Sequence, residues 1–338
     1  MRQKIIRGIA LASALFLGCN SGVAMARDIQ LSLPVDCRVG TVCMIQNYVD
    51  RDPGSGVQDY SCGRLSYDGH KGTDFRLPDA SWLDRGVRVL AAAPGKVLGV
   101  RNNVRDHAPG AYDRKKNKGR ECGNGVVIDH GDGWQTQYCH MRLGSVRVRK
   151  GDQVNRHQAL GLIGLTGKTE FPHLHMSLRL RGKVVDPFLG ARAKPGCGVI
   201  GRPMWRPEAL VDLAYRPSGI LAAGFTDQTP KLRQVVSGRH RNDRLDRSAD
   251  KLLFWVLIFG LQPGDEEVHS IIAPDGKVMA RHQGRPAKEH KARWFSYSGK
   301  RARGAWPAGT YRGEYQLLRT TGGRKRVVLK TTAQVRVY

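Results

Sequence analysis

The chain has 338 residues, a length that favours two domains over one. Its hydrophobic content of 40% and charged content of 25% are ordinary for a globular protein, which excludes a disordered or fibrous chain. The net charge of +27 is unusual, because 56 Lys and Arg stand against 29 Asp and Glu. An excess of this size favours partners that are polyanions or anionic surfaces.

The N-terminus carries the pattern of a secretory signal peptide over residues 1–26. Basic residues, an apolar run and small residues follow one another: Arg2, Lys4 and Arg7, then Ile9 to Gly18, then Ala24-Met25-Ala26. Cleavage after Ala26 leaves a charge of 27 − 3 = +24. An exported chain is not expected to bind nucleic acid. Its polyanionic partners would be envelope polymers or a membrane surface, in the periplasm or cell envelope.

A second route of export stays open at Cys19. The run Phe16-Leu17-Gly18-Cys19 loosely resembles a lipoprotein box, in which the cysteine is lipidated, although Phe16 and Leu17 fit it poorly. After residue 26 no further stretch of about 20 apolar residues occurs, so a transmembrane span is not expected.

Six cysteines remain after either cleavage, and an even set in an oxidising compartment predicts disulfides. They are Cys37, Cys43, Cys62, Cys122, Cys139 and Cys197. Spacing alone favours only a local bond between Cys37 and Cys43, and free buried thiols are the alternative.

In chain order, residues 27–60 form a lead-in segment that ends in a loop-like stretch, Asp50 to Gly56. Residues 61–197 then contain short β-like runs bounded by glycines, with no long helical periodicity, and predict a mainly antiparallel β domain. The runs are Val87–Leu90, Lys96–Val100, Gly125–Asp129, Trp134–Cys139, Leu160–Leu165 and His173–Leu180.

A polar insertion from Arg101 to Cys122, with the basic run Asp113 to Lys118, interrupts this domain and suits an exposed loop or the rim or lid of a cleft. Residues 198–338 contain no cysteine and predict a second all-β domain, a sandwich. Its runs are Gly219–Phe225, Leu252–Phe259, Val268–Ile272, Arg293–Ser298, Thr310–Leu318 and Val327–Tyr338. Its aromatic residues Trp255, Trp294, Trp306 and Tyr311 are expected in the core rather than stacked on sugars.

Several histidines have a spacing that suits metal chemistry. Because strand residues alternate between faces, His173 and His175 point the same way and Leu174 and Met176 the other. The same alternation places Trp134, Thr136, Tyr138 and His140 on one face of the preceding strand. A catalytic zinc site takes three protein ligands and keeps a water position, and two His with one Asp fit that count. Gly69 and Gly72 permit a tight loop that brings His70 and Asp74 to one ion.

Seven ordered motifs over about residues 62–190 resemble the lysostaphin-like zinc endopeptidases. They are His70-Lys71-Gly72-Thr73-Asp74-Phe75, Ala93-Pro94-Gly95-Lys96-Val97, Gly123 to Gly131, Tyr138-Cys139-His140-Met141, Lys150-Gly151-Asp152-Gln153-Val154, Gly164-Leu165-Thr166-Gly167, and Pro172-His173-Leu174-His175.

The resemblance implies that one zinc ion per chain is held by His70, Asp74 and His175, and that His140 and His173 are unligated catalytic histidines. It also implies a zinc metalloendopeptidase that cleaves peptide bonds in peptidoglycan stems or crosslinks. The sequence departs from the family pattern at two places that bear on substrate specificity. Met176 stands where an aromatic residue is frequent, and the insertion from Arg101 to Cys122 is longer than compact family members need. The alternatives are a catalytically silent wall-binding regulator of another hydrolase and an exported polyanion- or glycan-binding module.

Overall fold

The computed structural model describes residues 28–112, 118–239 and 241–338. The predicted signal peptide, the Cys19 alternative and the basic run from Asp113 to Asn117 lie outside the described residues. Within the described residues, no helix has the length and apolar character needed to cross a membrane.

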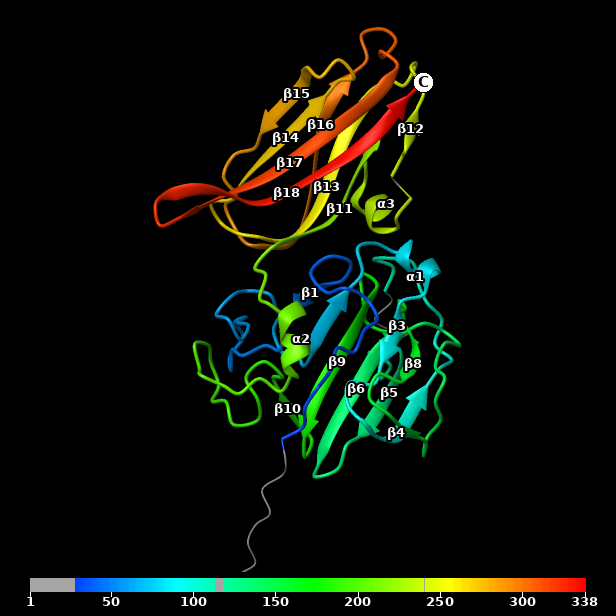
Figure 1. The fold of residues 1–338 in the computed structure, drawn as a ribbon, viewed down its shortest axis with the longest axis vertical. Helices are drawn as coiled ribbons and strands as arrows, with labels where there is room; N and C mark the ends of the chain where they lie inside the picture. Colours follow the sequence, from blue (N-terminus) through cyan, green and yellow to red (C-terminus); the bar gives the residue numbers. More distant parts are fainter. Residues whose placement is uncertain (1–27, 113–117, 240) are drawn as a thin grey trace, which may run out of the picture.

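The first half of the chain is built on one large antiparallel sheet (Figure 1). Its strands lie in the order β1-β2-β9-β6-β5-β4-β7, and β10 also pairs with β9. They are β1 (Met44–Asn47), β2 (Thr73–Arg76), β4 (Gly95–Arg101), β5 (Asn124–Asp129), β6 (Trp134–Met141), β7 (Gln153–Val154), β9 (His173–Leu180) and β10 (Lys183–Val185). A two-stranded sheet, β3 (Arg88–Leu90) with β8 (Ala159–Leu162), and the short helix α1 (Trp82–Arg85) complete this half.

The second half is a pair of facing sheets. One has the order β11-β13-β16 and the other β12-β18-β17-β14-β15, with β12 and β18 the parallel pair. The strands are β11 (Gly219–Thr226), β12 (Arg244–Leu245), β13 (Lys251–Leu261), β14 (Glu266–Ile272), β15 (Val278–Gln283), β16 (Lys291–Arg301), β17 (Gly309–Thr321) and β18 (Arg324–Val337), with helices α2 (Pro207–Asp212) and α3 (Leu232–Val236). The expected all-β architecture, an antiparallel sheet domain followed by a sandwich, is confirmed.

Strand β13 joins the two halves, because both of its faces are buried. Phe254, Val256 and Ile258 belong to the core of the sandwich. The alternate residues Trp255 and Leu257 belong to the core of the first half. A strand buried on both faces reads as a continuous apolar run, which is what its sequence shows. The sandwich therefore packs directly on the first half (Figure 1).

The segment before residue 61 is packed into the first half. Leu31, Val35 and Tyr48 are almost fully buried in its core, and β1 pairs with β2. This integration matters for function, because β1 and the residue after it reach the site described below. β1 and β2 are short and contain few apolar residues, so no local pattern in the sequence predicted them.

Three disulfides form within the described residues, so the alternative of free thiols is wrong. Cys37 bonds to Cys43, as the spacing predicted. The other two bonds are Cys62–Cys197 and Cys122–Cys139. The last of these ties the end of the insertion to β6.

Candidate metal centre

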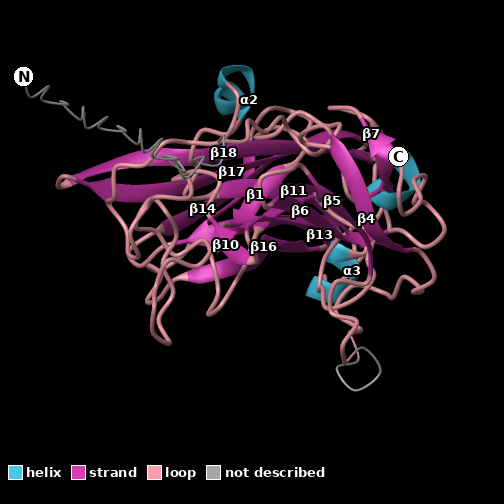
Figure 2. Ribbon diagram, turned by 90° about the horizontal axis from the view of Figure 1, so that it is seen from below, coloured by secondary structure: helices cyan, strands magenta, loops and turns pink. Residues whose placement is uncertain are grey.

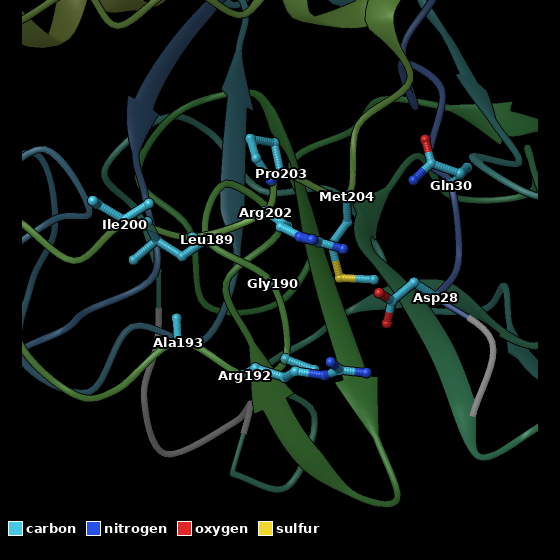
Figure 3. A pocket seen from close by; sticks show the side chains of 12 residues that line it. Asp28, Gln30, Leu189, Gly190, Arg192, Ala193, Ile200, Arg202, Pro203 and Met204 are labelled. Carbon is cyan, nitrogen blue, oxygen red and sulfur yellow. The ribbon is translucent and has the colours of Figure 1, made fainter. Parts of the chain in front are cut away.

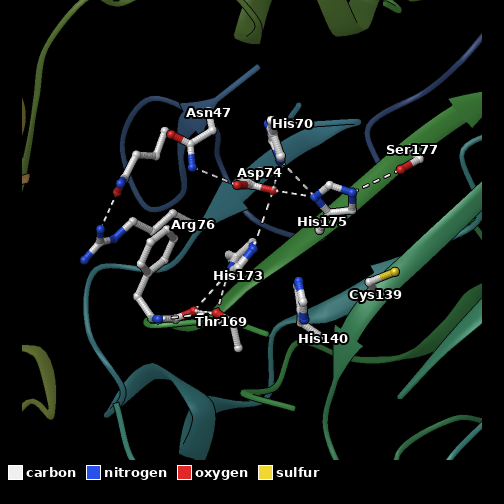
Figure 4. Close-up of polar contacts among 12 residues, drawn as sticks. Asn47, His70, Asp74, Arg76, Cys139, His140, Thr169, His173, His175 and Ser177 are labelled. Atoms are coloured by element: carbon white, nitrogen blue, oxygen red, sulfur yellow. Dashed lines mark hydrogen bonds and ion pairs between the residues drawn. The ribbon is translucent and has the colours of Figure 1, made fainter. Parts of the chain in front are cut away.

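Three side chains from distant parts of the chain converge on one face of the large sheet (Figure 4). His70 Nε2 lies 3.2 Å from Asp74 Oδ1 and 3.1 Å from His175 Nδ1, and His175 Nδ1 lies 2.8 Å from Asp74 Oδ1. These are the three residues for which the sequence predicted a shared ion. One oxygen and two ring nitrogens at these separations form a group that could hold a metal ion.

The strand register explains the convergence. β2 and β9 run antiparallel with Asp74 opposite His175 and Arg76 opposite His173, so these four side chains share one face. Leu174 and Met176, the alternate residues of β9, are 0% and 1% exposed in the core. Met176 therefore faces away from the metal group, which is the set of three side chains His70, Asp74 and His175, as predicted.

The approach of His70 to β9 requires glycine at position 72. A Cβ atom there would lie 2.6 Å from the carbonyl oxygen of Met176 and 2.7 Å from the ring of His175. Any side chain would force the loop and strand apart. The expected tight loop thus ends at Gly72, and Asp74 already belongs to a central strand.

Each of the three side chains is also held at its far atom. The Nδ1–H of His70 donates to the carbonyl of Tyr48 at 2.7 Å, and Nδ2 of Asn47 donates to Oδ2 of Asp74 at 2.8 Å. Nε2 of His175 lies 3.0 Å from Ser177 Oγ. Such outer contacts fix ring orientation and leave the inner atoms, His70 Nε2, Asp74 Oδ1 and His175 Nδ1, free for an ion.

Electrostatics favour a positive charge at this point. Burial alone would raise the pKa of Asp74, but the neighbouring His70 and His173 hold it well below its usual value. Burial lowers the pKa of His70, yet Asp74 and the Tyr48 carbonyl outweigh it, so the net pKa is raised. For His175, burial dominates and lowers the pKa. A buried carboxylate among imidazoles therefore attracts a cation, either a proton or a metal ion.

His140 reaches the same face by a route that strand alternation does not predict. The expectation that it shares a face with Trp134, Thr136 and Tyr138 is wrong. Tyr138 is fully buried in the core, whereas the ring of His140 lies 4.6 Å from that of His173.

The cause is a β-bulge in β6. Asn124 pairs with Met141 and Val126 with Tyr138, so Cys139 and His140 together oppose the single residue Gly125. His140 has φ 63°, a left-handed conformation that is uncommon outside glycine. Bulges of this kind re-aim a side chain, and here the bulge turns His140 toward the metal group.

His140 and His173 both border the three ligand candidates without belonging to them. The Nδ1–H of His140 donates to the Thr166 carbonyl at 2.8 Å, and burial holds the pKa of His140 well below 6.5. The ring is therefore neutral near pH 7 and its Nε2 carries a lone pair. Nδ1 of His173 contacts the carbonyl of Phe171 at 2.9 Å, and its Nε2 lies 3.5 Å from Asp74 Oδ1.

Several residues at the site carried no signal in the sequence. Asn47 and Tyr48 lie in the segment interpreted as a lead-in, and nothing local links them to Asp74 or His70. The ring of Tyr67, which is 48% exposed, lies 4.4 Å from that of His70. Only the fold brings these residues together.

Arg76 is a further unpredicted feature beside His173. It is fully buried, its Nη1 donates to Gln46, and its guanidinium lies 4.1 Å from the ring centre of Phe171, which in turn packs on His173. Nε and Nη2 of Arg76 have no hydrogen-bond partner in the described residues. Alternation along β2 from Asp74 would have placed Arg76 on this face, had the strand been predicted.

The described part of the insertion is fastened beside His140. The carboxylate of Asp106 accepts hydrogen bonds from the backbone N–H groups of Leu143 and Leu165 at 2.9 and 2.6 Å. The side chain of Asn124 bonds both backbone groups of Val104 at 2.8 Å. These contacts lie next to Thr166, the partner of His140, so the insertion is positioned to shape one border of the site.

A large cavity lies elsewhere and contains none of the five predicted site residues (Figure 3). Its volume is about 510 Å³, and its lining includes Asp28, Arg192, Arg202 and Met204. The five predicted site residues thus lie outside this cavity.

Comparison with known proteins places this sheet and its histidines in a family. Residues 68–187 match the model of Peptidase family M23. The chain is 38% identical over 117 residues to peptidoglycan DD-endopeptidase ShyA of Vibrio cholerae, covering 35% of this chain and 22% of ShyA. It is 32% identical over 124 residues to cell division protein DipM of Caulobacter vibrioides, covering 35% of this chain and 17% of DipM.

A crystal structure of a zinc-containing peptidase from Vibrio cholerae is similar at 27% identity, with a TM-score of 0.32, over 48% of this chain and 39% of that one. The chain spans about a fifth of the length of the curated relatives it matches. His70, Asp74, His140, His173 and His175 all lie inside the matched region. Residues 68–187 are therefore a Peptidase family M23 domain, and the resemblance to the lysostaphin-like zinc endopeptidases is confirmed.

Proposed function

We propose that this chain is a zinc metalloendopeptidase that hydrolyses peptide bonds in peptidoglycan. The observation that carries the proposal is the convergence of His70, Asp74 and His175, with their inner atoms 2.8–3.2 Å apart and two further histidines alongside. A family domain alone does not establish activity, because a regulator could keep the fold. The complete donor group is what favours an enzyme.

The donor group suits zinc. Two imidazole nitrogens and one carboxylate oxygen are the ligands of a catalytic zinc site that keeps a coordination position for water. Bond lengths of about 2.0–2.1 Å in tetrahedral geometry separate ligand atoms by roughly 3.3 Å, close to the separations of this group. The far atoms are already engaged by Tyr48, Asn47 and Ser177, so little reorganisation is needed.

In the proposed mechanism, His70, Asp74 and His175 would hold the zinc ion, which when bound would supply Lewis acidity toward the scissile carbonyl and a nucleophile from water near neutral pH. His140, neutral and held through Nδ1 by the Thr166 carbonyl, accepts a proton at Nε2 and passes it to the leaving amine. His173, when both of its ring nitrogens carry hydrogens, would donate from Nδ1 to the Phe171 carbonyl and from Nε2 to the developing oxyanion.

The substrate proposal draws on the relatives and on the charge. ShyA and ShyB of Vibrio cholerae are named peptidoglycan DD-endopeptidases. The proposed signal peptide over residues 1–26 would deliver the chain to the periplasm or cell envelope, where peptidoglycan is found. In this proposal residues 61–197 are the peptidase domain, residues 27–60 its lead-in, and residues 198–338 an accessory sandwich.

Two measurements test the proposal. Metal analysis of the purified protein is expected to give about one zinc per chain, and His70→Ala and His175→Ala to lose it. Incubation with purified peptidoglycan, followed by mass spectrometry, is expected to release peptide-containing fragments. Intact peptidoglycan after incubation with the zinc-loaded protein would contradict the enzyme and favour a wall-binding regulator. A zinc-free wild type would remove the basis of the mechanism.

A further inference from the structure

The longest hairpin of the protein extends beyond the sandwich to which it belongs. β17 and β18 contain 13 and 14 residues, and their tip reaches past the other strands in both views (Figures 1 and 2). Gly322 and Gly323 form the turn between the paired residues Thr321 and Arg324, with φ 58° and 73°. Positive φ at both turn residues is what a two-residue hairpin with twisted strands requires. The projection is therefore a regular ribbon.

The base of the ribbon is fastened to the sandwich. The guanidinium of Arg319 donates through Nε and Nη2 to the two carboxylate oxygens of Asp265, each at 2.8 Å. Its Nη2 also donates to Ser218 Oγ at 2.7 Å, and Asp265 is 1% exposed. A bidentate pair with a buried carboxylate is the strong form of such a contact. Residues beyond Arg319 therefore project from a fixed point.

Beyond this base nothing in the described chain covers the ribbon. Every residue from 320 to 328 is exposed, on both faces. Val327 and Val328 are 49% and 39% exposed, although they contribute to neither core. Valine favours a strand, but these two side chains pack against no other part of either core and are open to a partner at the projecting tip.

The charge at the tip has one sign. The sequence from Tyr315 to the end of the chain contains no Asp or Glu. Lys325 reaches back to Glu266, with Nζ 2.6 Å from its carboxylate oxygen. Within the described residues no carboxylate pairs with Arg324, Arg326 or Lys330. The tip therefore offers at least three uncompensated cations around two exposed valines.

We propose that this hairpin tip, residues 320–330, docks the protein on a bilayer containing anionic phospholipid. Cations attract the charged headgroups while neighbouring aliphatic side chains enter the boundary between headgroups and acyl chains. A soluble polyanion would account for the arginines, but it would leave the valines without a function. The surface lies in the sandwich and uses no residue of the metal centre, so it can fail or succeed independently of the peptidase proposal.

Vesicle co-sedimentation tests the proposal with the purified protein. Binding to vesicles of phosphatidylglycerol and phosphatidylcholine is expected, with little binding to pure phosphatidylcholine. Each Lys or Arg near an anionic surface contributes about a fivefold gain in affinity, so Arg324→Gln with Arg326→Gln is expected to weaken binding about 25-fold. Val327→Ser with Val328→Ser is expected to weaken binding that persists at high salt, because the apolar contribution is not screened.

The matched control is Lys150→Gln with Lys183→Gln, which removes the same charge from exposed positions in the first half of the chain. This control is expected to bind vesicles like the wild type, and circular dichroism checks that all variants are folded. Equal losses in the control and the tip variant would overturn the proposal, since overall charge would then explain binding. So would a valine variant indistinguishable from wild type, or wild type that binds dextran sulfate but no vesicles.

Discussion

Within the described residues, two buried polar clusters on β-sheets combine a carboxylate with histidine, and only the one in the first half brings acceptor atoms together. In the sandwich, Glu267 accepts hydrogen bonds from Trp294 Nε1 and Ser296 Oγ, both at 2.6 Å, and from Tyr315 OH at 3.0 Å. His269 Nε2 contacts the same Ser296 Oγ at 3.0 Å. Both oxygens of this carboxylate have donors, and His269 Nδ1 is the atom of the cluster that has no partner in the described residues.

In the first half the inner atoms face one another instead. The Nδ1–H of His70 is used on Tyr48, so a neutral His70 brings a lone pair to Asp74 Oδ1, and His175 adds a second ring nitrogen. Converging acceptors require a cation, whereas in the sandwich both oxygens of the Glu267 carboxylate already accept hydrogens from neighbouring side chains. The comparison shows that what distinguishes a metal site from a structural network is which atoms converge, not how many histidines are present.

The largest expected effect comes from removing the carboxylate of each cluster in turn. Asp74→Asn is expected to abolish zinc binding and to lower peptidoglycan hydrolysis by about a thousandfold or more, because an amide is a poor zinc ligand and transition-state stabilisation is lost. Zinc analysis and a fragment-release assay measure both. The matched variant Glu267→Gln is expected to leave zinc content and activity unchanged. Loss of zinc in Glu267→Gln as well would contradict the assignment of the metal site to the first half alone.

A somewhat smaller effect is expected when a histidine beside the ligands is changed. His140→Asn is expected to retain about one zinc per chain while lowering the rate by roughly 10²–10⁴-fold, the usual contribution of general acid–base catalysis. Asparagine tolerates the left-handed conformation at this position, so the bulge should persist. Loss of zinc in this variant would instead make His140 a ligand.

His269 in the sandwich cluster is expected to make the free energy of unfolding depend on pH. Burial lowers the pKa of His269 to about 4, compared with 6.5 for an ordinary histidine. The unfolded chain therefore takes up a proton as pH falls below about 6.5, while the folded chain does so only near 4. The contribution of His269 to the free energy of unfolding is thus fully present above pH 6.5. It falls by roughly 3 kcal/mol as the pH is lowered to about 4.

Urea unfolding between pH 4 and 7, with a chelator present so that metal loss makes no contribution, measures this slope. The variant His269→Phe is expected to flatten the dependence over that range. A slope that is the same in the variant and the wild type would place the titration elsewhere.

The smallest effect is expected when a hydrogen bond that holds a member of the metal group in place is removed. Asn47→Ala removes the donor to Asp74 Oδ2 and is expected to weaken zinc affinity by about 10–100-fold, the usual cost of losing an outer contact. Competition with a zinc chelator measures the affinity. Ser296→Ala, which removes a contact to Glu267 in the sandwich, serves as the control and should not alter zinc affinity. An unchanged affinity in Asn47→Ala would mean that β1 supports the fold alone.

The strands that were predicted have a strong local pattern. β9 coincides with the predicted run from His173 to Leu180, and β13 follows from a continuous apolar stretch. Short strands with few apolar residues, such as β1 and β2, were missed because pairing with β9 and with each other stabilises them, and local propensity does not.

The sequence by itself indicated the β architecture, because strand alternation and glycine spacing are local properties of the chain. Its seven ordered motifs, through their resemblance to the lysostaphin-like zinc endopeptidases, implied the three ligand candidates. It also indicated the Cys37–Cys43 bond, which joins residues six positions apart. Only the tertiary structure decided that His140 turns to the metal side, since a bulge opposite Gly125 depends on the neighbouring strand. The contacts from Asn47 and Tyr48 likewise depend on segments more than 20 residues away, whose approach no local pattern encodes.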